Sequence, residues 1–552
     1  MTTEPLTRSV ERCVLIHASR ATVFRSLLDP AGLSRWMYAN VRWTPTRGSS
    51  YRIEWKDTAV PAVAQGEILE IEQDRRLVLS WFMERDGIET TASFDLEDEE
   101  DERTAVRFRH SGFPEREDWP ASRIDMIALE WDKVLENLRF EVEEGTGGKP
   151  FYARIEQPLL ASRERANLYW VAPSCLVTWL AREAFLDPAA GSDFEFRLRE
   201  GGEARGTIRT FLPGRHLRLV WEENGVRSLL GLSFWPTAAG CMMTLTQRSY
   251  GIDEGDRARV LATWEARFAR LREAIERPVA AKEAQGSGSI ALTQIVLADP
   301  AETYRCFTDP GRLIGWFCDR AEFTASVDHP FAFLWTGYGE NRGVVEDLAP
   351  GERLRLRWEV AALHATTTLS IQLAPAGVDG SSTQVSLRHT GFPGDDVGEG
   401  ERAAHEAGWR SFLSLLDVYL REYGRGPRRS FLLRRRLQLS ASDAVARLTT
   451  SEGLASWLGA VVALDARDDG AIRVKLPDGT VLGGRFAMLS PEIGLSLELE
   501  EPEMLFLSVW WEGTDHQISV ALEGIAYGVP ESWPLRQRIV WGERLDRLAG
   551  LA

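Results

Sequence analysis

The feature that most constrains this chain of 552 residues is an internal duplication. The segment Asp29–Trp36 (DPAGLSRW) returns 280 positions later as Asp309–Trp316 (DPGRLIGW). The segment His110–Pro114 (HSGFP) returns 279 positions later as His389–Pro393 (HTGFP). Because both segments keep nearly the same spacing, the two halves of the chain are expected to repeat one structural plan.

Each half contains two different modules. Trp179-Leu180 and Trp457-Leu458 are each followed by five residues and a Leu-Asp pair, and Tyr250–Ile252 (YGI) matches Tyr527–Val529 (YGV). Glycine-rich joints such as Gly286-Ser287-Gly288-Ser289 separate the modules. We therefore predict four modules in the order A-B-A′-B′, spanning residues 8–144, 151–277, 289–424 and 429–552.

Within a module, the hydrophobic pattern predicts a fixed order of elements. In the first module, Val10–Ile16 is typical of a strand. The i,i+4 apolar pairs Val23 with Leu27 and Phe24 with Leu28 predict a short helix that Pro30 ends. Alternating runs such as Tyr51–Trp55 then predict antiparallel strands, and a long amphipathic helix is expected from about Asp118. The predicted order is one strand, two short helices, several strands and one long helix.

Composition and charge exclude several classes of function. A net charge of −17 argues against nucleic-acid binding, which needs a basic face. The five cysteines are odd in number and form no CxxC pair, so neither a disulfide framework nor a zinc site is indicated. The N-terminus has no apolar signal core and no run of about 18 apolar residues occurs, so we expect no membrane insertion and a cytoplasmic location.

The A segments resemble the START-like (SRPBCC) superfamily, specifically bacterial domains similar to the C-terminal domain of activators of the 90-kDa heat-shock protein (Hsp90) ATPase. The resemblance rests on residues 18–36, 66–70, 77–81 and 110–114 and on Trp131, and returns from residue 298 to Trp409. It implies an α+β fold of four tandem helix-grip domains. In each, a curved antiparallel sheet wraps a long C-terminal helix and leaves an apolar cavity. Members bind lipids, hormones or polyketides, and a minority catalyse.

The best polar candidates are two equivalent histidines. Strand alternation places His110 on the face of Val106 and Phe108, and His389 occupies the same place in the third module. A histidine in the cavity would orient a ligand or act as an acid or base. The alternative is a buried histidine, bonded to a nearby carbonyl, that holds the Gly-Phe-Pro turn.

Aromatic residues recur beside these histidines and either line a ligand pocket or fill the core. At the place of the histidine, B carries Gln247 and B′ carries Gly524, so A and A′ are the modules expected to hold a polar pocket group. The candidate ligand-binding residues are Trp36, Trp55, Trp81, His110, Phe113, Trp131, Trp316, Trp335, Trp358, His389, Phe392 and Trp409.

Two charge runs each allow two interpretations. The acidic run Glu97–Glu102 is a docking strip or a solvated hairpin tip, and the arginines between Arg425 and Arg436 grip an anionic partner or face a neighbouring module. No Gly-x-Ser-x-Gly elbow, P-loop or His-Glu-x-x-His motif occurs. The sequence therefore indicates no cofactor, no metal and no nucleophilic catalysis.

The function expected from these observations is non-catalytic binding of an apolar small molecule, or of a partner protein, through the A-type modules. One alternative is a polyketide-cyclase or aromatase-like enzyme in which His110 and His389 position a substrate carbonyl. The other is a chaperone-regulating interaction protein, although the four modules use all the sequence and leave no separate chaperone-binding domain. We also expect A to pair with B within the chain, in place of the dimer that a single module would form.

Overall fold

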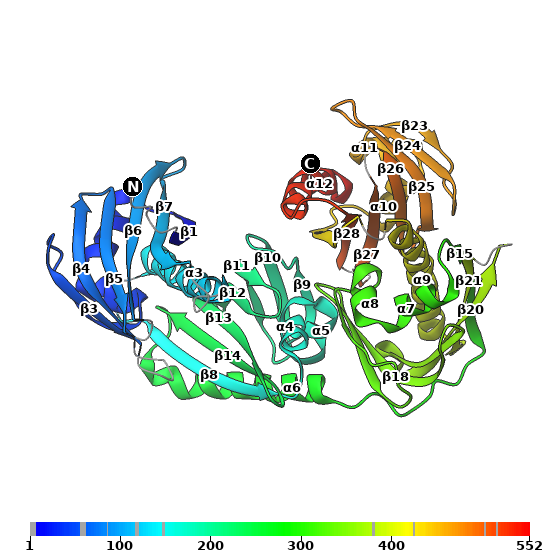
Figure 1. Ribbon diagram of the computed structural model, residues 1–552, viewed down its shortest axis with the longest axis horizontal. Coiled ribbons are helices and arrows are strands. Elements are labelled where there is room, and N and C mark those ends of the chain that lie inside the picture. The colour runs from blue at the N-terminus through cyan, green and yellow to red at the C-terminus, as the bar shows by residue number, and fades with distance from the viewer. Residues whose placement is uncertain are drawn as a thin grey trace. The chain divides into compact units, whose positions relative to one another are not determined.

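The computed structural model describes residues 7–55, 62–84, 87–115, 121–145, 149–377, 381–422, 425–501, 504–514 and 517–551 (Figure 1). The chain forms two compact units. Unit 1 comprises residues 1–156, 218–232 and 244–265, and unit 2 comprises residues 157–217, 233–243 and 266–552.

The first two modules follow the predicted order of elements. The elements of the first module are β1 (Thr7–Ile16), α1 (Arg20–Leu28), α2 (Pro30–Trp36), β2 (Ala39–Arg42), β3 (Ser50–Trp55), β4 (Val63–Glu72), β5 (Arg76–Met83), β6 (Ile88–Glu99), β7 (Arg103–Pro114) and α3 (Ala121–Glu144). Those of the second are β8 (Phe151–Leu159), α4 (Arg163–Val171), α5 (Pro173–Trp179), β9 (Ala181–Leu186), β10 (Asp193–Leu198), β11 (Glu203–Leu212), β12 (His216–Glu223), β13 (Val226–Thr237), β14 (Gly240–Ser249), η1 (Glu254–Asp256) and α6 (Arg257–Glu276).

The third and fourth modules repeat this order. The elements of the third are β15 (Gly288–Val296), α7 (Pro300–Thr308), α8 (Pro310–Trp316), β16 (Arg320–Glu322), β17 (Pro330–Trp335), β18 (Gly339–Ala349), β19 (Arg353–Val360), η2 (Ala361–Leu363), β20 (Ala365–Ala376), β21 (Ser382–Phe392) and α9 (Asp396–Glu422). Those of the fourth are β22 (Arg428–Arg436), α10 (Ala441–Thr449), α11 (Ser451–Trp457), β23 (Ala460–Leu464), β24 (Ala471–Lys475), β25 (Val481–Ser490), β26 (Gly494–Glu501), β27 (Leu505–Thr514), β28 (Gln517–Tyr527) and α12 (Trp533–Ala549).

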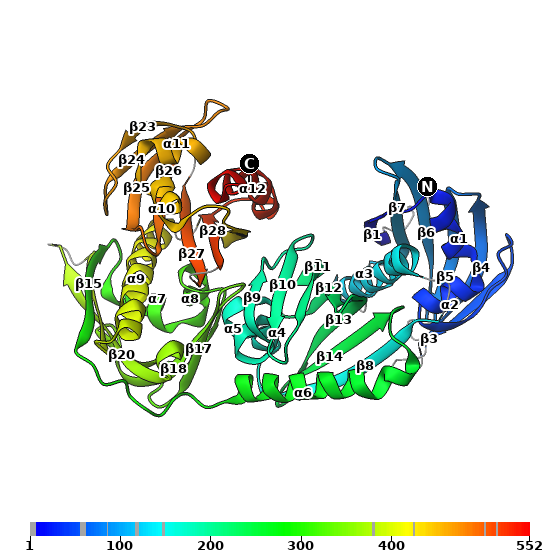
Figure 2. The same cartoon turned by 180° about the vertical axis from the view of Figure 1, so that it is seen from behind.

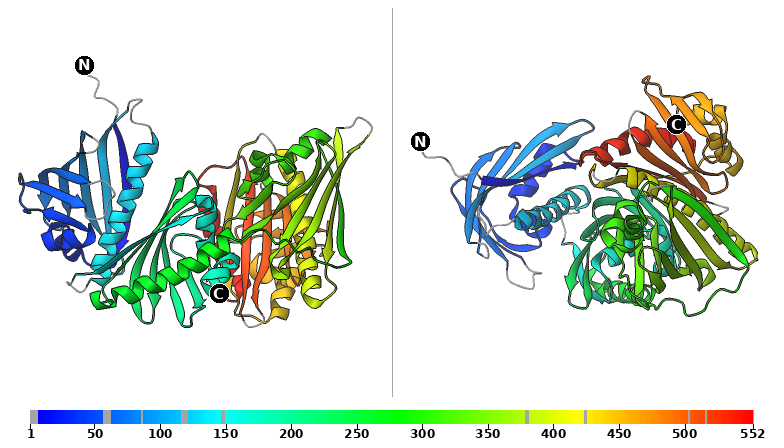
Figure 3. Two further views of the ribbon diagram at one scale, coloured as in Figure 1. Left: turned by 90° about the horizontal axis from the view of Figure 1, so that it is seen from below. Right: turned by 45° about the vertical axis from the view of Figure 1, so that its right-hand side comes forward.

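Each module holds one seven-stranded antiparallel sheet, in which the first strand pairs with the last. The order in the first sheet is β1-β7-β6-β5-β4-β3-β2, and the other three sheets repeat it. In unit 2 the third sheet curves around α9, and in unit 1 α3 lies along the first sheet (Figures 2 and 3). The expected fold class, four tandem helix-grip domains, is confirmed. None of the described helices is long and apolar enough to cross a membrane.

The repeated Asp-Pro segment forms the start of the second short helix. Asp29 accepts hydrogen bonds from the backbone N–H groups of Ala31 and Gly32, at 3.2 and 2.8 Å, and Pro30 occupies the first helical position. Asp309 accepts from the backbone N–H of Arg312 in the same way, at 3.1 Å. An acceptor before the helix and a proline at its start are both favourable, since the first N–H groups of a helix have no partner within it.

A tryptophan at the end of each second short helix ties the two short helices together. In all four modules its indole N–H donates to the carbonyl ten positions earlier, at 2.9 Å. The pairs are Trp36 with Ser26, Trp179 with Tyr169, Trp316 with Cys306 and Trp457 with Arg447. All four rings are at most 1% exposed. The bond satisfies a carbonyl near the end of the first helix, where the last carbonyls have no helical partner. We call this bond the indole lock.

The repeated His-x-Gly-Phe segment forms a β-bulge. The pairing of β1 with β7 shifts register as Arg8 meets Phe113 and Ser9 meets Ser111, which leaves Gly112 as the extra residue. Gly112 has a φ of 97°, and Gly391 repeats the arrangement with a φ of 104°. This backbone conformation favours glycine, because a Cβ atom makes it strained.

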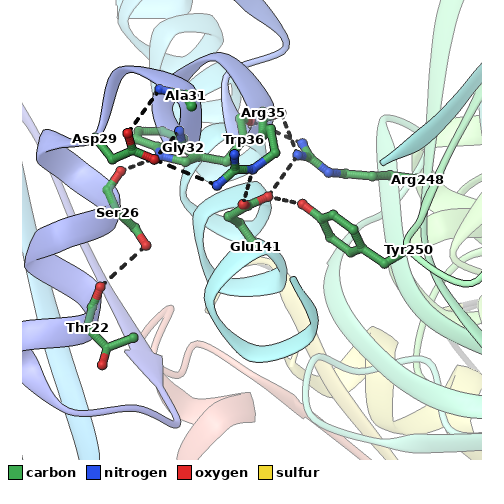
Figure 4. Close-up of polar contacts among 10 residues, drawn as sticks. All are labelled: Thr22, Ser26, Asp29, Ala31, Gly32, Arg35, Trp36, Glu141, Arg248 and Tyr250. Atoms are coloured by element: carbon green, nitrogen blue, oxygen red, sulfur yellow. Dashed lines mark hydrogen bonds and ion pairs between the residues drawn. The ribbon is translucent and has the colours of Figure 1, made fainter. Parts of the chain in front are cut away.

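Within unit 1, buried charges join the end of α3 to residues of β14 (Figure 4). Glu141 accepts from the Nε of Arg35 at 2.6 Å, from the Nη2 of Arg248 at 3.3 Å and from the hydroxyl of Tyr250. Arg248 also donates to the backbone carbonyls of Arg35 and Trp36 at the end of α2. We call Arg35, Glu141, Arg248 and Tyr250 the ionic clamp. The clamp joins the first module to Arg248 and Tyr250 of the second.

Within unit 2, the four corresponding positions of the third and fourth modules carry different residues, which form a different set of contacts. Tyr419 stands in the place of Glu141, Gly315 in that of Arg35, Ile525 in that of Arg248 and Tyr527 in that of Tyr250. The Tyr527 hydroxyl donates to the Gly315 carbonyl at 2.9 Å, and the Tyr419 and Tyr527 rings lie 5.9 Å apart. A Cβ on Gly315 would lie 2.7 Å from the Tyr419 ring. Glycine is therefore required by the tyrosine that replaces the carboxylate.

Of the two charge runs of the sequence, one lies at a turn between strands and the other forms ion pairs with other modules. The acidic run spans the turn between β6 and β7, and its Glu97 pairs with Arg107 at 2.7 Å. In the arginine run, Arg428 pairs with Asp319 of the third module at 2.6 Å, and Arg436 pairs with Glu195 of the second at 3.2 Å. These arginines therefore contact neighbouring modules of unit 2.

Candidate functional site

In the first module, the histidine of β7 is part of a chain of hydrogen bonds. The indole N–H of Trp131 on α3 donates to the Nδ1 of His110 at 2.9 Å, so this nitrogen carries no proton. The Nε2 then donates to the hydroxyl of Thr90 at 2.7 Å, and that hydroxyl donates to the Trp81 carbonyl at 2.8 Å. Both ring nitrogens of a neutral histidine are thereby used, and we call this arrangement the polar relay.

The third module repeats the relay. Trp409 donates to the Nδ1 of His389 at 3.2 Å, and the Nε2 lies 2.7 Å from the hydroxyl of Thr367, which donates to the carbonyl of Trp358. Burial lowers the pKa of His389 well below its usual value, with a smaller contribution from His405. A second proton would have to occupy Nδ1, which already accepts from Trp409. The relay therefore favours neutral histidine.

In the second module a glutamine forms the same relay. Gln247 accepts from the indole N–H of Trp264 at 2.8 Å through its Oε1 and donates to the hydroxyl of Ser228 at 3.1 Å. An amide presents an acceptor atom and a donor atom side by side, as a neutral histidine presents one accepting and one donating nitrogen. Gln247 thus shows that the hydrogen bonds of the relay can form without a titratable side chain.

In the fourth module apolar atoms take the place of the relay. A Cβ on Gly524 would lie 2.2 Å from the Phe431 ring, so this ring fills the space that the histidine fills elsewhere. The indole N–H of Trp541 donates to Gln537, one turn earlier on its own helix, at 3.1 Å. No buried donor of that tryptophan is left unpaired by the change.

The third module also holds a cavity between its sheet and α9. It measures about 230 Å³ and is lined by Phe317, Trp335, Asn341, Trp358, Glu401, Ala404, His405, Gly408, Trp409 and Phe412. A second space of about 20 Å³ lies behind Phe317, Trp358 and Trp409, and is too small for an organic ligand. The larger cavity is the candidate site, because it joins a mostly aromatic wall to a few polar groups.

Two polar groups of α9 line this cavity one turn apart. The Nδ1 of His405 lies 2.8 Å from the backbone carbonyl of Glu401, so Nδ1 carries the proton and Nε2 keeps its lone pair. Burial lowers the pKa of His405 and raises that of Glu401. In the described part of the chain, no hydrogen bond to Nε2 is formed. The cavity wall therefore offers one free acceptor.

One residue of the cavity wall, Trp358, also holds a donor without an acceptor. Trp358 is 2% exposed, and among the described residues none accepts a hydrogen bond from its Nε1–H. The neighbouring Trp335 differs, because its indole N–H donates to the Phe317 carbonyl at 2.6 Å. A buried donor without an acceptor costs about 1–3 kcal/mol, and a ligand oxygen would remove that cost.

The twelve residues predicted from the sequence fall into three groups. Trp335, Trp358 and Trp409 line the cavity of the third module. Trp36 and Trp316 form indole locks. The others lie in the core around the two relays: Trp55, Trp81, His110, Phe113, Trp131, His389 and Phe392.

Sequence reasoning missed the polar wall of the cavity. Glu401, His405 and Trp409 are spaced by four residues on one helix, a signal that would have placed them on one face. At the positions of Glu401 and His405 the first module has Arg123 and Ile127. Nothing in the sequence marks Asn341, which reaches the cavity from β18.

The comparison with protein families agrees with this geometry. The family model "Activator of Hsp90 ATPase homolog 1-like protein" matches residues 17–143 and 297–421. The two matched stretches lie in the first and third modules. Both copies of the Hsp90-activator-like module include the indole lock and the polar relay. A search of curated proteins finds no significant match.

Several solved structures are similar to parts of this chain. Protein MLL2253 from Mesorhizobium loti is 19% identical, with 23% of this chain and 98% of that chain covered and a TM-score of 0.22. The Aha1 dimer from Colwellia psychrerythraea is 21% identical, with 25% and 98% covered and a TM-score of 0.20. The di-domain ARO/CYC StfQ from the steffimycin biosynthetic pathway is 12% identical, with 48% and 98% covered and a TM-score of 0.24.

Proposed function

We propose that the third module binds a small, flat, mostly apolar molecule that carries a hydroxyl or carbonyl group. The observation that carries this proposal is the cavity of about 230 Å³, whose aromatic wall includes an unpaired indole N–H. A cavity of roughly 150 Å³ holds benzene, so this space suits a molecule of one or two rings. No step of catalysis is proposed.

The polar atoms support recognition of one oxygen. The N–H of Trp358 would donate to a hydroxyl or carbonyl oxygen, and the Nε2 of His405 would accept from a hydroxyl. The relay histidine His389 would act indirectly, because its bond to Trp409 fixes that ring in the cavity wall. This division of roles supports a binding site rather than an acid–base role for His389.

The test uses 2-naphthol and naphthalene with the whole chain, measured by calorimetric titration. We expect 2-naphthol to bind once per chain, about tenfold or more tightly than naphthalene, because one hydrogen bond to a buried group is at stake. Trp358→Phe should lower the affinity for 2-naphthol and leave that for naphthalene nearly unchanged.

The matched control is Trp81→Phe, the same change at the corresponding position of the first module. It should leave the binding of both probes as in the wild type. Equal affinities of the two probes, or loss of 2-naphthol binding in Trp81→Phe but not in Trp358→Phe, would contradict the proposal. Solvent extraction of the purified protein, followed by mass spectrometry, would identify the chemical class of any ligand that it retains.

A further inference from the structure

Unit 2 contains a second cavity, separate from the site just described. It measures about 370 Å³ and is lined by residues of the second, third and fourth modules: Pro173, Ser174, Val177, Arg182, Glu183, Ala184, Phe185, Glu195, Arg197, Gly337, Tyr338, Arg434, Arg436, Glu512 and Ser519. It shares no lining residue with the aromatic cavity of the third module. We call it the junction cavity.

Two residues that line the junction cavity hold buried hydrogen-bond donors without acceptors. Arg434 is 2% exposed, and it binds Glu512 through Nε and Nη2 at 2.6 and 2.8 Å. Its Nη1 has no hydrogen-bond partner among the described residues, and neither has the hydroxyl of Tyr338. The Arg434 guanidinium also lies 4.8 Å from the centre of the Tyr338 ring. Buried donors of this kind are costly unless an acceptor enters.

The charges of the wall favour an anion. Three of its four arginines are paired with its three glutamates: Arg434 with Glu512, Arg197 with Glu183 at 3.2 Å and Arg436 with Glu195 at 3.2 Å. The fourth, Arg182, donates to a backbone carbonyl and forms no ion pair within the described residues. The wall therefore carries one positive charge in excess.

Apart from Ser174 and Ser519, the rest of the wall is mostly apolar, which distinguishes it from a site for a bare inorganic ion. The ring of Phe185, the side chains of Pro173 and Val177 and the face of Tyr338 contribute hydrocarbon. Burial raises the pKa of Tyr338, so its hydroxyl stays protonated and can donate. An organic acid with a compact apolar body matches both the donors and the hydrocarbon.

We propose that the junction cavity binds a small organic carboxylate. One carboxylate oxygen accepts from the Nη1 of Arg434 and from the hydroxyl of Tyr338, and the apolar body lies against Phe185. Because the wall comes from three modules, such a ligand holds these modules of unit 2 together.

The test titrates the whole chain with benzoate, benzamide and inorganic phosphate, followed by calorimetry. We expect one saturable benzoate site, with benzamide weaker by roughly tenfold or more because it lacks the negative charge. Phosphate should compete weakly or not at all. No saturable benzoate binding up to about 10 mM, or equal binding of benzoate and benzamide at the site that Ala184→Trp removes, would overturn the proposal.

Variants locate the site. Tyr338→Phe should weaken benzoate roughly tenfold. Tyr304→Phe is the matched control, because its buried hydroxyl is also unpaired but lies outside the junction cavity. Ala184→Trp should abolish binding by filling the cavity. Trp358→Phe, which tests the aromatic cavity, should leave benzoate unaffected. A benzoate affinity unchanged in both Tyr338→Phe and Ala184→Trp would overturn the assignment.

Discussion

Removal of the carboxylate of the ionic clamp is the sharpest test of how unit 1 is stabilised. The Glu141 and Arg248 side chains are only 4% and 5% exposed. Glu141→Leu would leave Arg248 and Arg35 without their shared anion. Breaking a buried pair from one side costs about 3–5 kcal/mol. Since Arg248 retains the carbonyls of Arg35 and Trp36 as acceptors, we expect the lower end, about 3 kcal/mol.

Native-state hydrogen exchange with peptide-level mass spectrometry measures this cost on the whole chain. The opening free energy of peptides covering α2 and β14 should fall by about 3 kcal/mol, while peptides of unit 2 stay unchanged. Glu144→Gln is the control on the same helix, because Glu144 pairs with an Arg227 that is 46% exposed, and it should cost at most about 1 kcal/mol.

A double variant also removes the positive charge of Arg248, which Glu141→Leu leaves without its carboxylate. Glu141→Leu combined with Arg248→Met should recover at least half of the loss, because buried ion pairs are often replaceable by apolar groups. Unit 2 already uses Tyr419 and Ile525 at the corresponding positions. A Glu141→Leu variant within about 1 kcal/mol of the wild type would refute the reasoning.

Three further predictions concern the third module. His389→Gln should cost less than about 1 kcal/mol. His389→Leu leaves the indole N–H of Trp409 without an acceptor and removes the donor to Thr367, so it should cost about 1–3 kcal/mol in hydrogen-exchange opening free energy. Because the pKa of His389 is lowered in the fold, stability is full above the unfolded value near 6.5 and falls at lower pH, by at most about 1.4 kcal/mol per pH unit. His389→Gln should remove this contribution, and an unchanged pH profile would contradict it. Gly391→Ala should cost about 1–2 kcal/mol because its φ is 104°, and Gly394→Ala, where the added Cβ meets no atom within 4 Å, should cost less.

The fold was predictable because its signals are local and repeated. Asp29 and Pro30 mark the start of α2 by hydrogen bonding and by a fixed φ, and Asp309 and Pro310 mark α8 in the same way. Alternation in the strands and the period of the long helices fixed the order of the elements. The constant spacing between the repeated segments showed which modules are copies of one another.

The candidate site was predictable only in part. The recurrent tryptophans were visible, but the sequence does not distinguish Trp316, whose N–H is used in a lock, from Trp358, whose N–H is free. That difference depends on which carbonyl lies within reach, and reach is set by tertiary packing. Likewise, the junction cavity depends on contacts between modules of unit 2, which no local pattern records.

The tryptophan locks, found in all four modules, have a consequence for how this chain can change. A duplicated module is constrained by folding more than by function, so its side chains can change until a substitution impairs folding. The lock is present in all four modules, the relay is present with His110, Gln247 and His389, and Gly524 with Phe431 puts hydrocarbon in its place. Substitutions that harm folding are therefore spread over the whole chain. Substitutions that harm only the two proposed binding sites should be concentrated in the third module and at the junction cavity.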